Sequence, residues 1–349
     1  MTWFDEFSSN TLAAGGNQSV CFPTGEQVGR VYYRVFAGGE YRYSLLFADT
    51  IDSTYADGSL SRAEEVCGAW EITHLALGVC REVGKAPTLP LTIGGAASHA
   101  VTAGETFTTD PVTLAAEAGD YLCVEIGFRG DKVPCHLETQ IPVYRREGDR
   151  FVPSAEVPLP SMVGCDRPVK RRVGYLGDSI TQGIGVAPNS YAHWNAVLSE
   201  ALGRPYAYHN LGLGFGRAAD AAKDGAWLAK AKRNDVVTVC FGVNDLGRGR
   251  TADEIVGDLA FIVRSLKEAG CRVLLQSVPP FTYTPEHRTL WATVNRRLAA
   301  EVAQTADAFF DVETVLGSDS ERYGGHPNEA GCLAWGQALI PYLKKLLEY

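Results

Sequence analysis

The pattern of apolar and polar positions changes near residue 165. Before this point, short runs of aromatic and β-branched residues are separated by Gly, Asp and Pro, which is typical of β-strands. Strands are predicted over residues 28–36, 41–47, 70–79, 89–93, 105–108, 121–128 and 139–144. Ala37–Glu40 is typical of a hairpin turn between the first two strands. Helical periodicity is weak apart from an alanine-rich stretch near Ala115, so we expect an all-β sandwich, such as a jelly roll.

After residue 165, buried apolar runs alternate with segments of helical period. Strands are predicted over residues 170–176, 206–211, 235–241, 271–278 and 308–312. Helices are predicted over residues 191–202, 218–231, 251–270, 285–306 and 329–347, the third opening with a capping box at Thr251 and Glu254. This alternation predicts a parallel sheet with helices on both faces. In such sheets, ligands bind at the carboxyl ends of the strands.

Residues 151–168 contain four prolines and no sustained period, which indicates a linker. We therefore expect two domains. Residues 1–165 would form the β-sandwich with its proline-rich linker, and residues 166–349 would form the α/β domain.

The charge balance narrows the possible partners. A net charge of −9 argues against binding nucleic acid or an anionic membrane surface. No apolar run reaches membrane-spanning length, and the N-terminus has no signal-peptide pattern, so a cytoplasmic location is expected. The nine cysteines are scattered without a C-x-x-C pair, which favours buried thiols over a metal site.

Four motifs follow predicted strands or precede the last helix. They are Gly177–Thr181 with Ser179, the glycine-rich Asn210–Gly216, Gly242–Asp245 with Asn244, and Gly324–Asn328 with His326. Taken singly, each also fits an ordinary helix cap, turn or loop. A dinucleotide loop is disfavoured because the glycine spacing is not G-x-G-x-x-G. Together, the motifs place a serine, backbone amides, an asparagine amide and a histidine at one rim of one sheet.

These motifs resemble the four blocks of the SGNH (GDSL-type) hydrolases. The resemblance spans residues 170–349 and implies a flavodoxin-like α/β/α fold. A β-sandwich placed before such a domain is similar to the carbohydrate esterases of family two.

The resemblance implies a serine esterase that forms an acyl-enzyme and needs no metal or other cofactor. Ser179 would be the nucleophile and His326 the general base. The oxyanion hole would use the Ser179 amide, an amide of the glycine loop at Gly214 or Gly216, and the Asn244 side chain. We expect Asp178 and Asp245 to take part in binding the substrate.

Two positions depart from the family pattern. Phe215 stands where the family usually has its oxyanion glycine, and Tyr323 stands where it has the aspartate that orients the histidine. Three arrangements remain open for His326. A nearby acid can replace the aspartate, a backbone carbonyl can orient the ring, or the enzyme is weak. The nearby acids are Asp311, Glu313, Asp319 and Glu321.

Three functions are compatible with these residues. The leading hypothesis is an esterase for short acyl groups, acetyl above all, on a sugar or oligosaccharide. The second is a lysophospholipase or acyl-thioesterase using the same site. The third is a catalytically weak glycan-binding protein. We expect Trp194, Trp291 and Trp335 to be core residues rather than sugar platforms.

Overall fold

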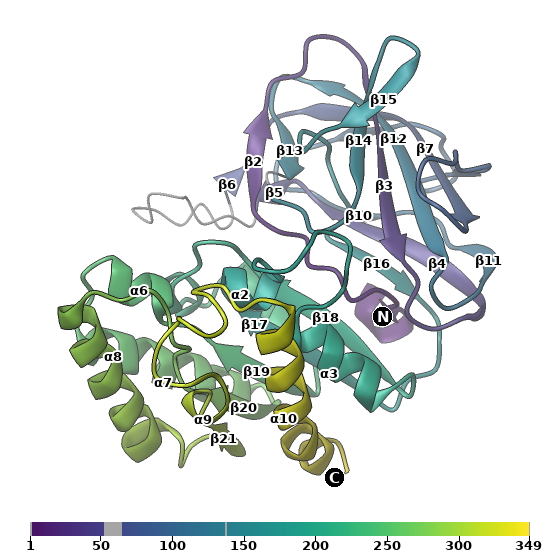
Figure 1. The fold of residues 1–349 in the computed structure, drawn as a ribbon. Helices are drawn as coiled ribbons and strands as arrows, with labels where there is room; N and C mark the ends of the chain where they lie inside the picture. The colour runs from purple at the N-terminus through teal and green to yellow at the C-terminus, as the bar shows by residue number, and fades with distance from the viewer. Residues whose placement is uncertain (1, 52–64, 137, 349) are drawn as a thin grey trace. The chain divides into compact units, whose positions relative to one another are not determined.

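The computed structural model describes residues 2–51, 65–136 and 138–348. They form two compact units, one ending at Val169 and one beginning at Lys170 (Figure 1). The division of the chain into two independently folding domains at residue 165 stays a prediction.

The first unit is mostly antiparallel β-structure, as predicted. Its short helix is α1 (Trp3–Glu6), and its strands are β1 (Ser8–Ser9), β2 (Gln18–Cys21), β3 (Gln27–Arg34), β4 (Gly39–Ala48), β5 (Thr50–Ile51), β6 (Glu65–Val66), β7 (Trp70–Cys80), β8 (Leu89–Leu91), β9 (His99–Val101), β10 (Thr106–Thr108), β11 (Val112–Ala116), β12 (Tyr121–Gly130), β13 (Val133–His136), β14 (Val143–Glu147), β15 (Arg150–Pro153) and β16 (Met162–Cys165). One sheet has the order β1-β16-β4-β10 with β11 paired to β4, and the other has the order β15-β14-β3-β12-β7-β8 with β9 paired to β7. The pairs β13-β2 and β5-β6 are separate.

The predicted hairpin at Ala37–Glu40 is wrong. Strand β3 pairs with β12 and β14, whereas β4 lies in the other sheet. Both edges of β3 are occupied by strands distant in sequence, so the turn carries the chain from one sheet to the other. The alanine-rich stretch near Ala115 is strand β11, which pairs with β4.

The predicted linker over residues 151–168 is also wrong, because it contains sheet strands. β15 ends at Pro153, and β16 pairs with β1 on one side and β4 on the other. The prolines lie outside β16, where no backbone N–H is needed for the ladder. Four buried residues, Met162–Cys165, form this inner strand.

The second unit has a five-stranded parallel sheet of order β18-β17-β19-β20-β21. Its strands are β17 (Arg171–Gly177), β18 (Tyr206–Gly212), β19 (Val236–Cys240), β20 (Arg272–Gln276) and β21 (Ala308–Phe310). Its helices are α2 (Ser179–Gln182), α3 (Trp194–Leu202), α4 (Ala218–Ala221), α5 (Ala226–Ala231), α6 (Val243–Gly247), α7 (Ala252–Glu268), α8 (Pro285–Arg297), the π-turn η1 (Leu298–Val302), α9 (Glu313–Leu316) and α10 (Glu329–Leu347). This strand order is the flavodoxin-like one, which confirms the predicted fold class.

Helices form two packed groups around this sheet. Helix α3 packs on α10, and α7 packs on α4 and α8. Trp194 of α3 stacks on Trp335 of α10 with ring centroids 5.1 Å apart. Both rings and Trp291 are buried, which confirms that they are core residues. The helix predicted over 218–231 is broken into α4 and α5, because Ala222 and Gly225 leave the helical conformation.

Candidate active site

The candidate nucleophile lies directly after β17, an inner strand of the parallel sheet. That strand ends at Gly177, Asp178 caps the next helix, and Ser179 is the first residue of α2. The Asp178 carboxylate accepts a hydrogen bond from the Ile180 amide at 3.0 Å. The Ser179 amide therefore stands at a helix start, where N–H groups have no partner within the helix.

Two glycines allow α2 to lie close to the sheet. A Cβ on Gly177 would lie 2.1 Å from Thr181 Oγ1, and one on Gly212 would lie 2.1 Å from the Gln182 amide nitrogen. Contacts this short are forbidden, so any side chain at either position would push α2 away from β17 and β18.

His326 reaches Ser179 from the loop before α10. Its Nε2 lies 2.8 Å from Ser179 Oγ, so the structure brings this predicted pair together. Phe281, in the loop after β20, places its ring edge-on to the imidazole, with centroids 5.3 Å apart. Gly185 supports the loop from behind, because a Cβ there would lie 2.9 Å from His326 Cβ. Sequence analysis did not identify Gly185, because its positive φ of 113° is visible only in the structure.

The imidazole has no acidic partner in the part of the chain that the structure describes. Within residues 2–51, 65–136 and 138–348, no carboxylate forms a hydrogen bond or ion pair with His326. Asp311 instead accepts from the Ser277 hydroxyl at 2.9 Å, and Asp319 accepts from the Glu321 amide at 3.1 Å. Burial lowers the pKa of His326, so the ring is neutral at neutral pH and Nε2 can accept the serine proton.

The glycine loop makes a tight turn after β18. The Gly216 N–H donates to the Leu213 carbonyl at 3.2 Å. Phe215, inside this turn, has φ of 60°, a left-handed conformation that favours glycine and is uncommon for aromatic residues. The residue that replaces the family's glycine therefore adopts a glycine-like backbone. Gly214 is buried within the same turn.

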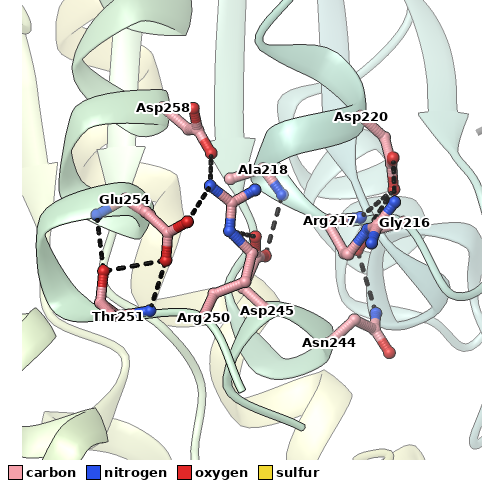
Figure 2. Close-up of polar contacts among 10 residues, drawn as sticks. All are labelled: Gly216, Arg217, Ala218, Asp220, Asn244, Asp245, Arg250, Thr251, Glu254 and Asp258. Atoms are coloured by element: carbon pink, nitrogen blue, oxygen red, sulfur yellow. Dashed lines mark hydrogen bonds and ion pairs between the residues drawn. The ribbon is translucent and has the colours of Figure 1, made fainter. Parts of the chain in front are cut away.

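Asn244 lies in α6, which begins after Gly242. The Asn244 Nδ2 donates to the Gly216 carbonyl at 3.0 Å (Figure 2). An amide nitrogen carries two protons, so this bond leaves one for a ligand. The geometry therefore connects two predicted oxyanion elements, the asparagine and the glycine loop.

The two aspartates predicted to bind substrate are buried. Asp178 is 1% exposed and Asp245 is 0% exposed. Burial raises the pKa of Asp178 to about 7 and that of Asp245 to about 6. Each carboxylate accepts a backbone amide at the start of a helix, α2 for Asp178 and α4 for Asp245. This placement favours a positioning role over contact with substrate.

Metal-ligand clusters and membrane-spanning helices are both absent from the part of the chain that the structure describes. No group of three or more His, Cys, Asp or Glu side chains is arranged to hold a metal ion there. No helix among the described residues is long and apolar enough to cross a membrane. The nine cysteines are free thiols, and all except Cys21 and Cys80 are buried.

Comparison with known proteins agrees with the motif analysis. Residues 175–333 match the model of the GDSL-like Lipase/Acylhydrolase family. No curated protein matches the sequence significantly.

Similar solved structures include three carbohydrate esterases. One is an active-site mutant of a family two carbohydrate esterase from Clostridium thermocellum, 12% identical over 98% of both chains, with a TM-score of 0.43. A family 2 enzyme with a carbohydrate binding domain from Corynascus thermopiles is 14% identical over 98% of this chain and 99% of its own, with a TM-score of 0.44. A family 3 enzyme from Talaromyces cellulolyticus is 20% identical over 51% of this chain and 98% of its own, with a TM-score of 0.41. Sequence identities and TM-scores this low do not identify the substrate.

The four motifs of the second unit lie within or beside the matched segment, and they follow its strands in the order that the resemblance predicted. Residues 175–333 thus resemble the GDSL-like Lipase/Acylhydrolase family, and this match supports a carboxylic ester hydrolase.

Proposed function

We propose that the protein is a serine esterase that hydrolyses short acyl esters, with acetyl esters of a carbohydrate as the leading substrate. The observation that carries the proposal is the 2.8 Å contact between Ser179 Oγ and His326 Nε2. A hydroxyl and a neutral imidazole at this distance form a nucleophile and its general base. The choice of a sugar as the alcohol component of the ester is based on the resemblance in domain order.

The reaction would proceed through an acyl-enzyme. As the Ser179 oxygen bonds to the acyl carbon, its proton passes to His326 Nε2. The tetrahedral intermediate collapses when the bond to the alcohol oxygen breaks, and His326 returns the proton to that oxygen. Water then repeats the sequence and releases the acid. Since no carboxylate among the described residues contacts His326, the pair would work as a dyad.

The oxyanion would be held by backbone and side-chain donors. The Ser179 amide and the second proton of Asn244 Nδ2 are the donors we favour. Gly214 and Gly216 stay predictions for the glycine-loop donor, and the Gly216 amide already donates to Leu213 at 3.2 Å. Removal of one such donor costs about 3 kcal/mol in other hydrolases.

Hydrolysis of para-nitrophenyl acetate, butyrate and octanoate by wild type and Ser179→Ala tests the proposal. We expect acetate turnover to fall at least about 10³-fold in Ser179→Ala. Ser265→Ala, on the distant helix α7, is the matched control and should retain activity. Equal rates in Ser179→Ala and wild type would remove the catalytic assignment, and a glycan-binding role would then lead.

The chain-length series separates the second hypothesis. Preference for octanoate would favour a lysophospholipase or acyl-thioesterase over an acetylesterase. Release of acetate from acetylated oligosaccharides would then test the sugar directly. The cytoplasmic location and the absence of a nucleic-acid partner stay predictions of the sequence.

A further inference from the structure

Two consecutive residues of α6 hold the two ends of one short segment. Asn244 Nδ2 donates to the Gly216 carbonyl at 3.0 Å, and the Ala218 amide donates to Asp245 Oδ2 at 2.9 Å (Figure 2). Segment 216–218 joins the glycine loop to α4. The position of Asn244 relative to that loop therefore depends on both contacts.

The Asp245 carboxylate is fully buried but only partly hydrogen-bonded. Its Oδ1 has no hydrogen bond within the described part of the chain. Its ion-pair partner among the described residues is Arg250, whose Nε lies 3.9 Å from Oδ1. A buried anion needs such a partner, because removing its charge from water is costly.

Arg250 is held against Asp245 by the chain itself. Its backbone N–H donates to the Asp245 carbonyl at 3.2 Å, which folds residues 245–250 into a closed turn. Its Nη2 lies 2.8 Å from Oδ2 of Asp258, a residue of α7. The guanidinium thus lies between two carboxylates, as Figure 2 shows.

The other charges in this cluster already have partners. Arg217 binds Asp220 with Nη2 at 2.7 Å from Oδ1. The Glu254 carboxylate accepts from the Thr251 amide at 2.8 Å, and its contact with Arg250 Nη2 is longer, 3.9 Å. Burial raises the pKa of Asp245, and the charge of Arg250 opposes this rise. Among the described residues, Arg250 is therefore the cation placed to keep Asp245 charged.

We infer that Arg250 is a positioning residue of the oxyanion hole: it holds the buried Asp245 carboxylate against the start of α4 and thereby keeps segment 216–218 in place for Asn244. This inference rests on the proposed esterase function. Arg250 does not touch the reacting atoms. Its effect passes through Asp245 and reaches the transition state through Asn244 and the glycine loop.

Kinetics of para-nitrophenyl acetate hydrolysis test this chain of contacts. In Arg250→Ala we expect kcat to fall about tenfold with little change in KM, since the oxyanion exists only in the transition state. Arg250→Lys should recover part of the loss, because it restores the charge. Lys267→Ala, which breaks a 2.6 Å ion pair with Asp307 at the other end of α7, is the matched control and should leave kcat unchanged.

A double mutant separates positioning from general damage. If Arg250 acts through Asn244, Arg250→Ala should cost much less in an Asn244→Ala background than in wild type. An equal cost in both backgrounds, or an unchanged kcat in Arg250→Ala, would overturn the inference. Should Arg250→Ala fail to fold, Asp258→Asn loosens the same guanidinium and is expected to lower kcat more mildly, and an unchanged kcat would count equally against it.

Failure of this inference differs from failure of the proposed function. If Ser179→Ala is inactive while both Arg250→Ala and Asp258→Asn match wild type, the esterase stands and the positioning role is wrong. If Ser179→Ala keeps full activity, the esterase itself is wrong.

Discussion

The two sides of the candidate site each contain a buried aspartate, but among the described residues only Asp245 faces a cation. On the nucleophile side, Asp178 Oδ1 caps α2 and Oδ2 has no hydrogen bond within the described chain. On the oxyanion side, Asp245 caps α4 and faces Arg250 at 3.9 Å. The pKa of Asp178 is raised to about 7 and that of Asp245 to about 6.

The same contrast holds for the residues that these aspartates support. Asn244 is joined to the glycine loop, and its neighbour Asp245 is joined to α4 and Arg250. His326 contacts Ser179 and the edge of Phe281, and no acid orients its ring in the described chain. The site therefore has most of its polar support on the side proposed to hold the oxyanion, where charge would develop during ester hydrolysis.

In this comparison of the two sides, the largest effect is expected from replacing Asn244. Asn244→Ala should lower kcat about 10²–10³-fold, because one oxyanion donor and the bond to Gly216 disappear together. Steady-state kinetics on para-nitrophenyl acetate measure it. Asn234→Ala is the control, since that residue bonds only to the backbone at the end of α5. A fall in kcat of less than about threefold in Asn244→Ala would contradict the view that the polar support is concentrated on the oxyanion side.

Replacement of Asp178, which has no ion-pair partner among the described residues, should change the stability of the protein rather than the oxyanion hole. With its pKa raised to about 7, Asp178 binds a proton in the folded state that the unfolded state releases, so wild-type stability falls as pH rises towards 7. Asp178→Asn keeps a capping oxygen and should be more stable than wild type at pH 8 by roughly 2–4 kcal/mol, with a smaller difference at pH 5.

Urea unfolding at both pH values measures this difference. Asp224→Asn is the control, because that carboxylate is exposed and paired with Lys232. A stability difference that does not depend on pH would show that Asp178 is charged in the folded protein.

Restoring an acid near the histidine should raise activity. Tyr323→Asp places a carboxylate three residues before His326, and we expect kcat/KM to rise up to about tenfold, because the anion stabilises the imidazolium. The acid limb of the pH profile should also move to higher pH. Tyr323→Asn has a similar shape without charge and controls for loss of the tyrosine. Equal rates in both variants would indicate that position 323 does not reach the ring.

The smallest expected effect is the position of the wild-type acid limb. Activity needs neutral His326, and burial lowers its pKa, so kcat/KM should rise with pH and reach half of its plateau below pH 6.5. A profile from pH 4.5 to 8 measures it, and its repetition in Asp178→Asn removes the titration of that carboxylate. A midpoint above 6.5 would point to an acid that approaches His326 in solution.

Much of the second unit could be predicted from the sequence because its signals are local. The inner strands β19 and β20 are buried on both sides and are mainly apolar, and α7 carries its own capping box at Thr251 and Glu254. In the first unit, the strands were mostly predicted but their partners were not. The pairing of β3 with β12 and β14 depends on residues 87 to 116 positions away, and the local turn at Ala37–Glu40 gave no indication of it.

The sequence by itself determined the order of elements, the alternation that produces the parallel sheet, and the placement of Ser179, Asn244 and His326 after strands or before a helix. These follow from periodicity, capping and topology, which are properties of short segments. Only the tertiary structure decided which groups meet. Among the described residues it left His326 without an acid, buried Asp178 and Asp245, and set Arg250 against the second of them. Such contacts depend on the distance between side chains and on their desolvation. The sequence shows neither, because only folding brings residues that are far apart in the chain close together and buries them.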